Sequence, residues 1–285
     1  MRTANDAPSL RAAVRAWKHE GRTVGFVPTL GNLHLGHYSL LDVARKHADR
    51  VVVSVFVNPT QFAAGEDFEK YPRTLVQDSA GLAEHDCDLL FAPDVDAVYP
   101  FGAQHSISIH VPQITEMLEG AHRPGHFDGV ATVVAKLFAL VAPDLAVFGQ
   151  KDWQQLLLVK RLVRELAMPI EIIAAPTLRA DDGLALSSRN QYLSSSERAI
   201  APQIHLTLEW MRDAMRDGDP REMVESAAIQ RLERAGFVPD YAVVRHAEDL
   251  SVPGDGEREG LIALIAAKLG ATRLIDNLVF DCDRP

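Results

Sequence analysis

Two histidines, His34 and His37, occur in the sequence HLGH, and imidazoles at this spacing can donate hydrogen bonds to phosphate oxygens. The apolar run at 23–27 predicts a buried strand, and apolar residues at helical spacing over 36–48 predict a helix. At such a junction we expect unpaired backbone N–H groups and the helix dipole to meet a negative ligand, which Gly36 lets approach closely. The segment indicates an adenylate-forming or nucleotidyl-transfer site, with a chance match in a solvated loop as the alternative.

Amide side chains follow a second predicted strand at 51–57. Asn58 and Gln61 lie in the sequence FVNPTQF at 56–62, where they could hold a hydroxyl or a carboxylate without adding charge. An ordinary Asn-Pro turn is the alternative. The sequence EKYPR at 69–73 continues this loop, and we interpret it as part of a lid.

The sequence FGQKDWQQ at 148–155 marks another junction from a strand to a helix. Gly149 permits close approach to a ribose, and Lys151 can neutralise phosphate charge. Asp152 can accept from ribose hydroxyls or face a metal. One helical turn later, Gln155 is expected to point toward the same pocket as Gln61. Helix capping is the alternative for this segment.

Two further segments carry basic side chains. The sequence EGAHRPGH at 119–126 is loop-like and opens an amphipathic helix, so Arg123 could contact an anion, or the loop could be solvated. Ser187, Ser188 and Arg189 offer two hydroxyls and a guanidinium, a set that suits a triphosphate. A structural turn would explain these serines but not Arg189.

The first part of the chain alternates strands with helices. Strands are predicted at 23–27, 51–57, 88–92, 145–148 and 170–174, and helices at 36–48, 74–85, 129–141 and 152–166. Several of these strands are near-continuous apolar runs, as strands buried on both faces must be. The fold class is therefore α/β, a doubly wound, Rossmann-like parallel sheet whose ligands bind beyond the carboxyl ends of the strands.

The pattern changes after Pro176. A capping box at 194–197 predicts a long amphipathic helix to about Met215, and a second helix is predicted at 220–235. Strands at 240–245, 261–267 and 272–280 follow, with a hairpin loop at 251–260. We predict a domain of residues 1–176 and a second, smaller α+β domain of residues 177–285.

Composition and charge argue against several classes of protein. The chain of 285 residues is 47% hydrophobic and 24% charged, with a net charge of −10. This balance disfavours a nucleic-acid binder, which needs a basic surface. No apolar run reaches membrane-spanning length, and the first residues lack the apolar core of a signal peptide. Cys87 and Cys282 form neither a disulfide framework nor a metal motif, so we expect a cytoplasmic protein.

These segments together resemble one family, the pantothenate synthetases or pantoate–β-alanine ligases. The matching sequences, in chain order, are VPTLGNLHLGH, FVNPTQF, YPRT, EGAHRPGHFDGV, FGQKDWQQ, DGLALSSRN and RLIDN. The pattern HxGH is shared with a broader nucleotidyltransferase superfamily, whereas FVNPxQF, KDxQQ and SSRN together are specific.

The resemblance implies a set of site residues. The implied ATP-binding residues are Leu30, Gly31, Asn32, Leu33, His34, Leu35, Gly36, His37, Gly149, Gln150, Lys151, Asp152, Leu178, Leu186, Ser187, Ser188 and Arg189. Among these, His34, His37, Lys151 and Arg189 would be catalytic, with His37 as the proton donor. Gln61 and Gln155 would hold pantoate, and Gln61 would also contact β-alanine.

The resemblance also implies the reaction. Pantoate would attack the α-phosphorus of ATP·Mg²⁺ to give pantoyl adenylate and pyrophosphate, and β-alanine would then displace AMP. Residues 1–176 would bind the nucleotide and pantoate, residues 177–285 would act as a lid, and the protein would be a homodimer. No residue is assigned as a metal ligand, and no nucleic-acid or membrane partner is expected.

Three alternatives remain open at this point. Another nucleotidyltransferase would keep the nucleotide on its product. A class I aminoacyl-tRNA synthetase would need a basic surface for tRNA, against the net charge of −10. A catalytically silent nucleotide-binding or scaffold protein would bind ATP without releasing pyrophosphate in response to pantoate.

Overall fold

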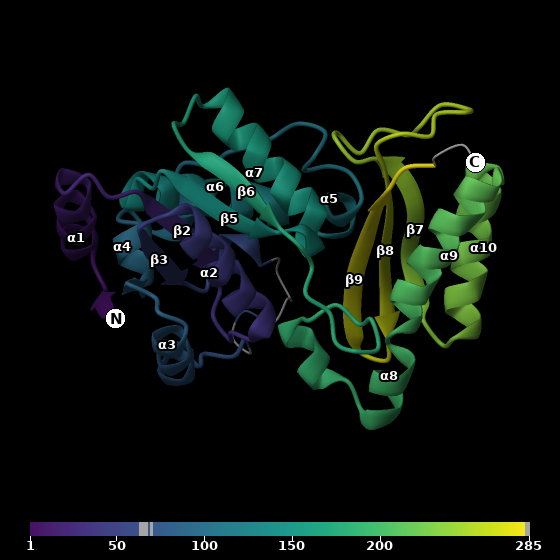
Figure 1. Cartoon of the computed structure of the whole chain (residues 1–285), viewed down its shortest axis with the longest axis horizontal. Helices are drawn as coiled ribbons and strands as arrows, with labels where there is room; N and C mark the ends of the chain where they lie inside the picture. Colours follow the sequence, from purple (N-terminus) through teal and green to yellow (C-terminus); the bar gives the residue numbers. More distant parts are fainter. Residues whose placement is uncertain (63–67, 69–70, 283–285) are drawn as a thin grey trace. The chain divides into compact units, whose positions relative to one another are not determined.

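The computed structural model describes residues 1–62, 68 and 71–282 (Figure 1). It divides into two compact units. The N-terminal unit comprises Met1–Gln150 and Gln154–Pro176, and the C-terminal unit comprises Lys151–Trp153 and Thr177–Pro285. Three residues from the middle of the chain therefore belong to the C-terminal unit.

The N-terminal unit is built on a six-stranded parallel sheet. Its strands are β1 (Arg2–Ala4), β2 (Val24–Thr29), β3 (Arg50–Val55), β4 (Leu89–Phe91), β5 (Leu145–Gly149) and β6 (Glu171–Ala175). They lie in the order β1-β4-β3-β2-β5-β6, and the neighbouring pairs are parallel.

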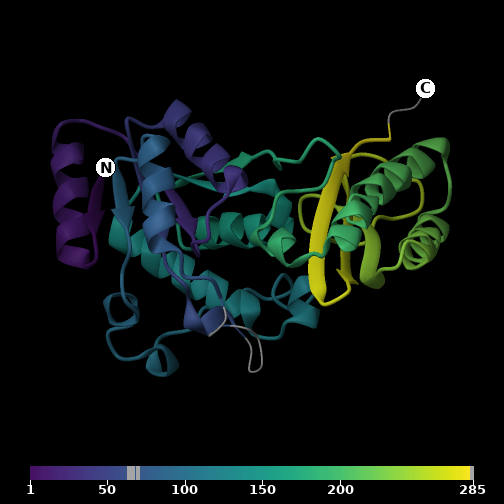
Figure 2. The same cartoon turned by 90° about the horizontal axis from the view of Figure 1, so that it is seen from below.

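Helices cover both faces of this sheet (Figures 1 and 2). They are α1 (Ala7–His19), α2 (Leu35–His47), α3 (Leu75–Glu84), α6 (His126–Val141) and α7 (Trp153–Glu165), with the short α4 (Val95–Val98) and α5 (Glu119–His122). Val27 packs in a cluster with Leu41 of α2 and Leu82 of α3. Phe26 points to the opposite face and meets Phe138 of α6, with the ring centroids 6.2 Å apart. Because both faces are buried, the predicted doubly wound α/β fold is confirmed.

The C-terminal unit packs helices against an antiparallel sheet. Its elements are α8 (Ser195–Ile200), α9 (Gln203–Asp217), α10 (Arg221–Arg234), β7 (Val238–His246), β8 (Leu261–Leu269) and β9 (Thr272–Phe280), and the strands lie in the order β7-β8-β9. Its core joins Leu208 of α9 and Leu232 of α10 to Ile265 of β8. This arrangement matches the predicted smaller α+β part.

One expectation about the helices needs correction, and one helix was not predicted. The capping box is present, since Glu197 N donates to Ser194 Oγ at 3.3 Å and Ser194 N donates to Glu197 Oε2 at 2.7 Å. The long helix predicted after it is wrong, because α8 ends before Pro202, which has no N–H for the carbonyl four residues earlier. Helix α1 was not predicted, although Asp6 caps it and accepts from Ser9 N at 2.7 Å.

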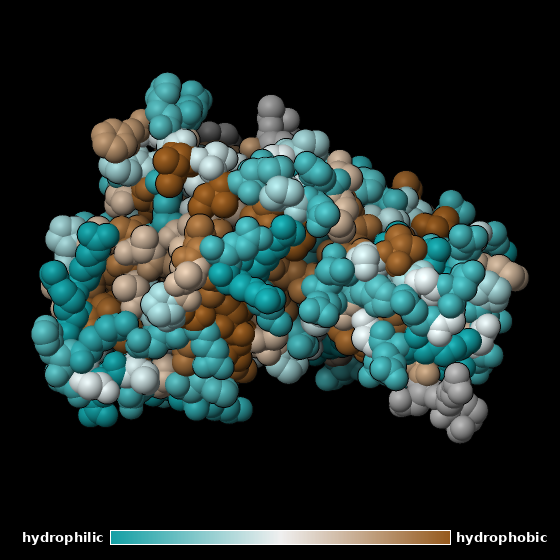
Figure 3. Space-filling view, turned by 90° about the horizontal axis from the view of Figure 1, so that it is seen from above, coloured by the Kyte–Doolittle hydropathy of each residue, from teal (hydrophilic) through white to brown (hydrophobic). Residues whose placement is uncertain are grey.

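The surface mixes polar and apolar residues. Figure 3 shows apolar surface, coloured brown, on the N-terminal unit among hydrophilic residues. Two large apolar side chains of this unit, Phe101 and Ile107, are 83% and 71% exposed. No helix among the described residues combines the length and apolar character needed to cross a membrane.

Candidate active site

The sheet gathers the motif segments of the N-terminal unit at one edge. Parallel strands end at the same edge, and β3, β2 and β5 are neighbours. The segment with Gln61 follows β3, HLGH follows β2, and Gly149 ends β5. Three predicted segments that are far apart in the sequence therefore emerge side by side.

The strand order reverses direction between β2 and β5. The strands that follow β2 in sequence, β3 and β4, lie on one side of it, whereas β5 and β6 lie on the other. Doubly wound sheets bind ligands at this kind of switch point. In addition, β2 pairs with β5 only at Gly25–Leu145 and Phe26–Ala146, so the two strands stop pairing before Thr29 and Gly149. The HLGH segment begins just beyond this opening in the ladder.

The two histidines cap helix α2 with their own rings. Nδ1 of His34 accepts from Gly36 N at 3.1 Å, and Nδ1 of His37 accepts from His34 N at 3.3 Å. Because a backbone N–H can only donate, neither Nδ1 carries a proton, and each neutral ring carries its proton on Nε2. The ring centroids are 4.1 Å apart. Two N–H donors on Nε2 atoms therefore lie next to each other at the N-terminus of α2.

This capping corrects the expectation of unpaired backbone N–H groups at the junction. The N–H groups of His34 and Gly36 are bonded to imidazole nitrogens, and His37 N donates to His34 O at 2.7 Å. These three amides are therefore already bonded within the segment. The dipole of α2 still favours negative charge at this N-terminus.

A buried carboxylate that the sequence interpretation missed holds the turn before the histidines. Asp78 of α3 is 2% exposed, and it accepts from Asn32 N at 3.0 Å and Leu33 N at 2.8 Å. Gly31 has a φ of +90°, and a Cβ there would lie 2.9 Å from Val55 Cγ1. Asp78 lies one helical turn before the buried Leu82, so an acidic residue on the apolar face of α3 was the available signal.

A hydrogen-bond relay orients the side-chain amide of Gln61. Asn58 Oδ1 accepts from Thr60 N at 3.3 Å and from the Tyr99 hydroxyl at 2.7 Å, which identifies this atom as the oxygen. Asn58 Nδ2 then donates to Gly129 O at 3.2 Å and to Gln61 Oε1 at 3.0 Å. Burial raises the pKa of Tyr99, which keeps its hydroxyl protonated. Gln61 therefore keeps its Nε2 donor on the side away from Asn58.

His126 holds the backbone of the same segment. It is the first residue of α6, and its Nδ1 donates to Gln61 O at 2.8 Å. Its Nε2 accepts from Arg123 Nη1 at 3.0 Å. Gly129 on α6 is required here, because a Cβ would come within 2.3 Å of Thr60 O. The stretch expected to be a loop is thus partly helical, and it positions Arg123 against His126.

The two glutamines at 154 and 155 differ in their surroundings. Gln154 is 3% exposed, and its Nε2 donates to Ile114 O at 2.6 Å and Met117 O at 2.8 Å. Gln155 is only partly buried. It follows β5 and Gln61 follows β3, the two strands that flank β2 in the sheet.

Of the other predicted site residues, Gln150 ends the first segment of the N-terminal unit, whereas Lys151, Asp152, Leu178 and 186–189 belong to the C-terminal unit. Lys151 Nζ lies 3.6 Å from Asp152 Oδ1, and Lys151 O accepts from Asn277 Nδ2 at 2.8 Å. Leu186 N donates to Leu178 O at 2.9 Å, so these two leucines lie together.

Arg189 lies in a short 3₁₀ turn of this unit. Ser187 caps the turn by accepting from Arg189 N at 3.3 Å, and the Arg189 side chain is exposed. The turn explains Ser187 structurally and leaves the guanidinium in solvent. Of the segment EKYPR assigned to a lid, Glu69 and Lys70 lie outside the described residues.

Comparisons with known proteins agree on one family. The family model described as pantoate-beta-alanine ligase matches residues 2–279. A pantothenate synthetase of Xanthomonas oryzae pv. oryzae (strain PXO99A) is 57% identical over 280 residues, covering 98% of this chain and 100% of that protein. A pantothenate synthetase of Xanthomonas campestris pv. campestris (strain B100) is 54% identical over 284 residues, covering 98% of this chain and 100% of that protein.

Solved structures show the same relationship. Pantothenate synthetase from Thermus thermophilus is 45% identical, covers 100% of both chains and has a TM-score of 0.91. Pantoate-beta-alanine ligase from Francisella tularensis, solved with beta-gamma ATP and beta-alanine, is 34% identical and has a TM-score of 0.82. The alignment covers 98% of this chain and 97% of that one. The resemblance inferred from the motifs is confirmed, and the chain belongs to the pantoate–β-alanine ligase family.

Proposed function

We propose that this protein condenses (R)-pantoate with β-alanine at the expense of ATP, forming pantothenate, AMP and pyrophosphate. The observation that carries the proposal is the pair of imidazole Nε2–H donors of His34 and His37 at the N-terminus of α2. This pair lies beyond the carboxyl end of β2, beside the switch point of the sheet. Membership of the family supports the same activity.

The first chemical step forms pantoyl adenylate. A carboxylate oxygen of pantoate bonds to the α-phosphorus of ATP, and the bond from that phosphorus to the bridging oxygen of pyrophosphate breaks. The step brings two anions together, so neutralisation of charge dominates its catalysis. We assign this work to His34 and His37 in the N-terminal unit and to Lys151 and Arg189 in the C-terminal unit, with His37 Nε2–H as the proton donor.

The second step forms the amide. The amine of β-alanine attacks the acyl carbon of the adenylate, a C–N bond forms, the C–O bond to AMP breaks, and the amine loses a proton. Water would hydrolyse the adenylate, which is the reason for assigning the C-terminal unit the role of a lid.

The substrates are assigned by segment. We assign the segments 30–37, 149–152 and 186–189, together with Leu178, to the binding of ATP. We assign Gln61 and Gln155 to the binding of pantoate, and Gln61 also to the binding of β-alanine. The relay through Asn58 supports the role of Gln61, because it fixes the amide with its oxygen toward Asn58 and its N–H donor on the other side.

Mg²⁺ fits this scheme as part of the ATP·Mg²⁺ substrate. Among residues 1–62, 68 and 71–282 there is no group of three or more His, Cys, Asp or Glu side chains that could hold a metal ion. Mg²⁺ keeps several waters and often binds through substrate phosphates. We therefore assign it to phosphate oxygens and water and name no protein ligand.

We also propose a homodimer formed through the N-terminal unit in a reducing cytoplasm. The exposed Phe101 and Ile107 supply apolar surface that a second copy could cover. Cys87 and Cys282 are free, buried thiols, and burial raises the pKa of Cys87 to about 12. Sedimentation of the purified protein tests the dimer, since a monomer at micromolar concentration contradicts it.

A coupled assay tests the activity. Pantoate, β-alanine and ATP are each omitted in turn while AMP and pyrophosphate are measured. We expect pyrophosphate to require pantoate, and AMP to require β-alanine as well. ATP binding without pantoate-dependent pyrophosphate would favour a silent nucleotide-binding protein. A nucleotide retained on the product would favour another nucleotidyltransferase.

A further inference from the structure

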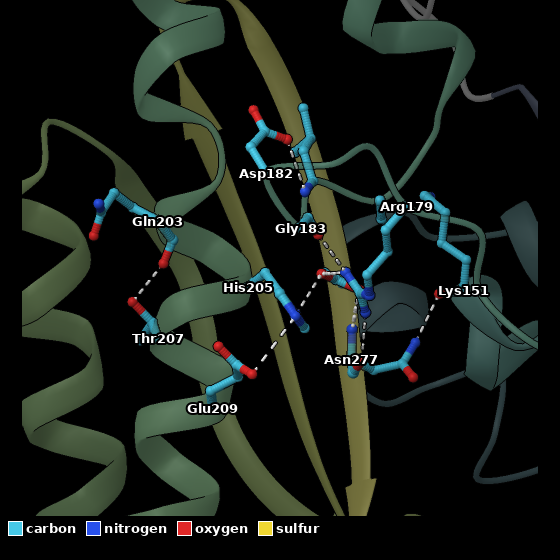
Figure 4. A network of polar contacts seen from close by, with 12 residues as sticks. Lys151, Arg179, Asp182, Gly183, Gln203, His205, Thr207, Glu209 and Asn277 are labelled. Atoms are coloured by element: carbon cyan, nitrogen blue, oxygen red, sulfur yellow. Dashed lines mark hydrogen bonds and ion pairs between the residues drawn. The ribbon is translucent and has the colours of Figure 1, made fainter.

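The sequence RLIDN at 273–277 has no assigned role in the reaction, yet two of its residues contact site segments within the C-terminal unit. Asn277 of β9 is 6% exposed, and its Nδ2 donates to the backbone carbonyl of Lys151 at 2.8 Å (Figure 4). The two residues are 126 positions apart in the chain. A buried side-chain amide therefore fixes the backbone of the lysine assigned to phosphate.

The neighbouring Asp276 holds Asn277 through its backbone. Its carboxylate is 3% exposed and makes a two-pronged ion pair with Arg179, at 2.5 Å to Nη1 and 2.9 Å to Nη2. Asp276 Oδ1 also accepts from Asn277 N at 2.8 Å. Arg179 in turn donates to Gly183 O at 3.0 Å and Asn277 O at 3.3 Å. Such paired, charge-assisted hydrogen bonds specify geometry strongly.

The segment that carries Lys151 needs external anchors. Gln150–Asp152 forms a single 3₁₀ turn, whose internal hydrogen bonds have poorer geometry than those of an α-helix. Side-chain hydrogen bonds anchor this turn and the residue after it, from Asn277 to Lys151 O and from Trp153 Nε1 to Ala247 O at 2.9 Å. Both anchors lie in the C-terminal unit. The position of Lys151 therefore depends on β9 as well as on its own helix.

We infer that Asn277 is a positioning residue for Lys151, and that Asp276 and Arg179 hold Asn277 in place for this task. The inference rests on the proposed role of Lys151 at the phosphates. A displacement of about 1 Å in a catalytic group can lower a rate by about 10²-fold, so loss of this hydrogen bond should lower the rate.

Asn277→Asp is the test variant, because it keeps the shape of the side chain and removes the Nδ2 donor. It also adds a negative charge, so the uncharged Asn277→Ser is measured beside it and should show the same loss. We expect kcat for pantoate-dependent pyrophosphate release to fall about 10-fold or more, while KM for pantoate stays within about 2-fold. Thr207→Val is the matched control. It removes another buried side-chain bond to a carbonyl of the same unit, Thr207 Oγ1 to Gln203 O at 2.7 Å, and should leave kcat unchanged. Wild-type kcat in Asn277→Asp overturns the inference.

A double-mutant cycle separates this inference from the proposed function. Lys151→Ala alone should lower pyrophosphate release by at least about 10²-fold. Adding Asn277→Asp to Lys151→Ala should lower it no further, because Asn277 acts through Lys151. A second, multiplicative loss overturns the positioning role and leaves the proposed function intact. Normal release by Lys151→Ala refutes the phosphate role of Lys151 and the inference with it. Asn277→Ser, whose side chain is one atom shorter, repeats the test if Asn277→Asp does not fold.

Discussion

The segments around His37 and Lys151 are held in opposite ways. The rings of His34 and His37 cap the helix that carries them, so their geometry comes from four consecutive residues. Lys151 is held by Asn277 through a contact that spans 126 positions. A locally determined group can be recognised from a short motif, whereas a group held from far along the chain depends on the complete C-terminal unit.

Substitution of His37 should have the largest effect and should separate its two ring nitrogens. His37→Asn can place an acceptor near the position of Nδ1 and so keep the cap, but it lacks the Nε2–H donor. We expect pyrophosphate release to fall by at least about 10²-fold while the melting temperature changes little. His37→Gln, which can reach the position of Nε2 without the cap, is the matched variant and should retain more activity. Near-normal release by His37→Asn would contradict the assignment of the proton donor.

Removal of the Asp78 carboxylate tests whether the geometry of the histidine segment also depends on a residue outside it. In Asp78→Asn, one of the amides of Asn32 and Leu33 would face an NH₂ group, so we expect a stability loss of about 1–3 kcal/mol. Pyrophosphate release should fall about 10-fold. Thr74→Val removes only the bond from Thr74 Oγ1 to Asp78 and should have a smaller effect on both. Equal effects of the two variants would show that Asp78 does not hold this turn.

Gln155→Ala should act on one substrate only. Loss of one hydrogen bond of about 1 kcal/mol raises KM for pantoate by about 5- to 10-fold, and KM for ATP should stay within about 2-fold. Gln154→Ala serves as the contrast, because it breaks the bonds to Ile114 and Met117 and should lower the melting temperature instead. Weakening of pantoate and ATP to the same extent by Gln155→Ala would refute its role.

The smallest effect is expected from His205, next to the Asp276–Arg179 pair. Burial and the charge of Arg179 lower its pKa from the ordinary 6.5, so protonation favours the unfolded chain. Its contribution to stability is therefore complete above about pH 6.5 and is lost as the pH falls toward the lowered pKa. His205→Gln should flatten the dependence of urea stability on pH between about 7.5 and about 5.5. An unchanged slope in His205→Gln would contradict the prediction.

The difference between local contacts and contacts between distant residues explains how much could be predicted from the sequence. The strand, turn and helix around HLGH have strong local signals, and β8 is a long apolar run, so these elements were predicted to within about two residues. The break at Pro202 also had a local signal, since proline lacks the N–H that a continuous helix needs. The long helix was predicted from the helical spacing of apolar residues, and this spacing continues across Pro202.

The site itself was predictable only in part. The types and spacing of His34, His37 and Gln61 pointed to phosphate and to a polar substrate. The support from Asp78, Tyr99 and Asn277 was not predicted, because each contact joins residues at least 41 positions apart. Hydropathy patterns report burial, and they do not show which buried polar groups will pair.

The assignment of Lys151–Trp153 to the C-terminal unit has a consequence for engineering. The polypeptide passes between the two units three times, after Gln150, after Trp153 and after Pro176. A single cut at 176/177 would leave the C-terminal fragment without the tripeptide that Asn277 and Ala247 bind. Chimeras that exchange this half between related enzymes should therefore transplant residues 151–153 together with residues 177–285.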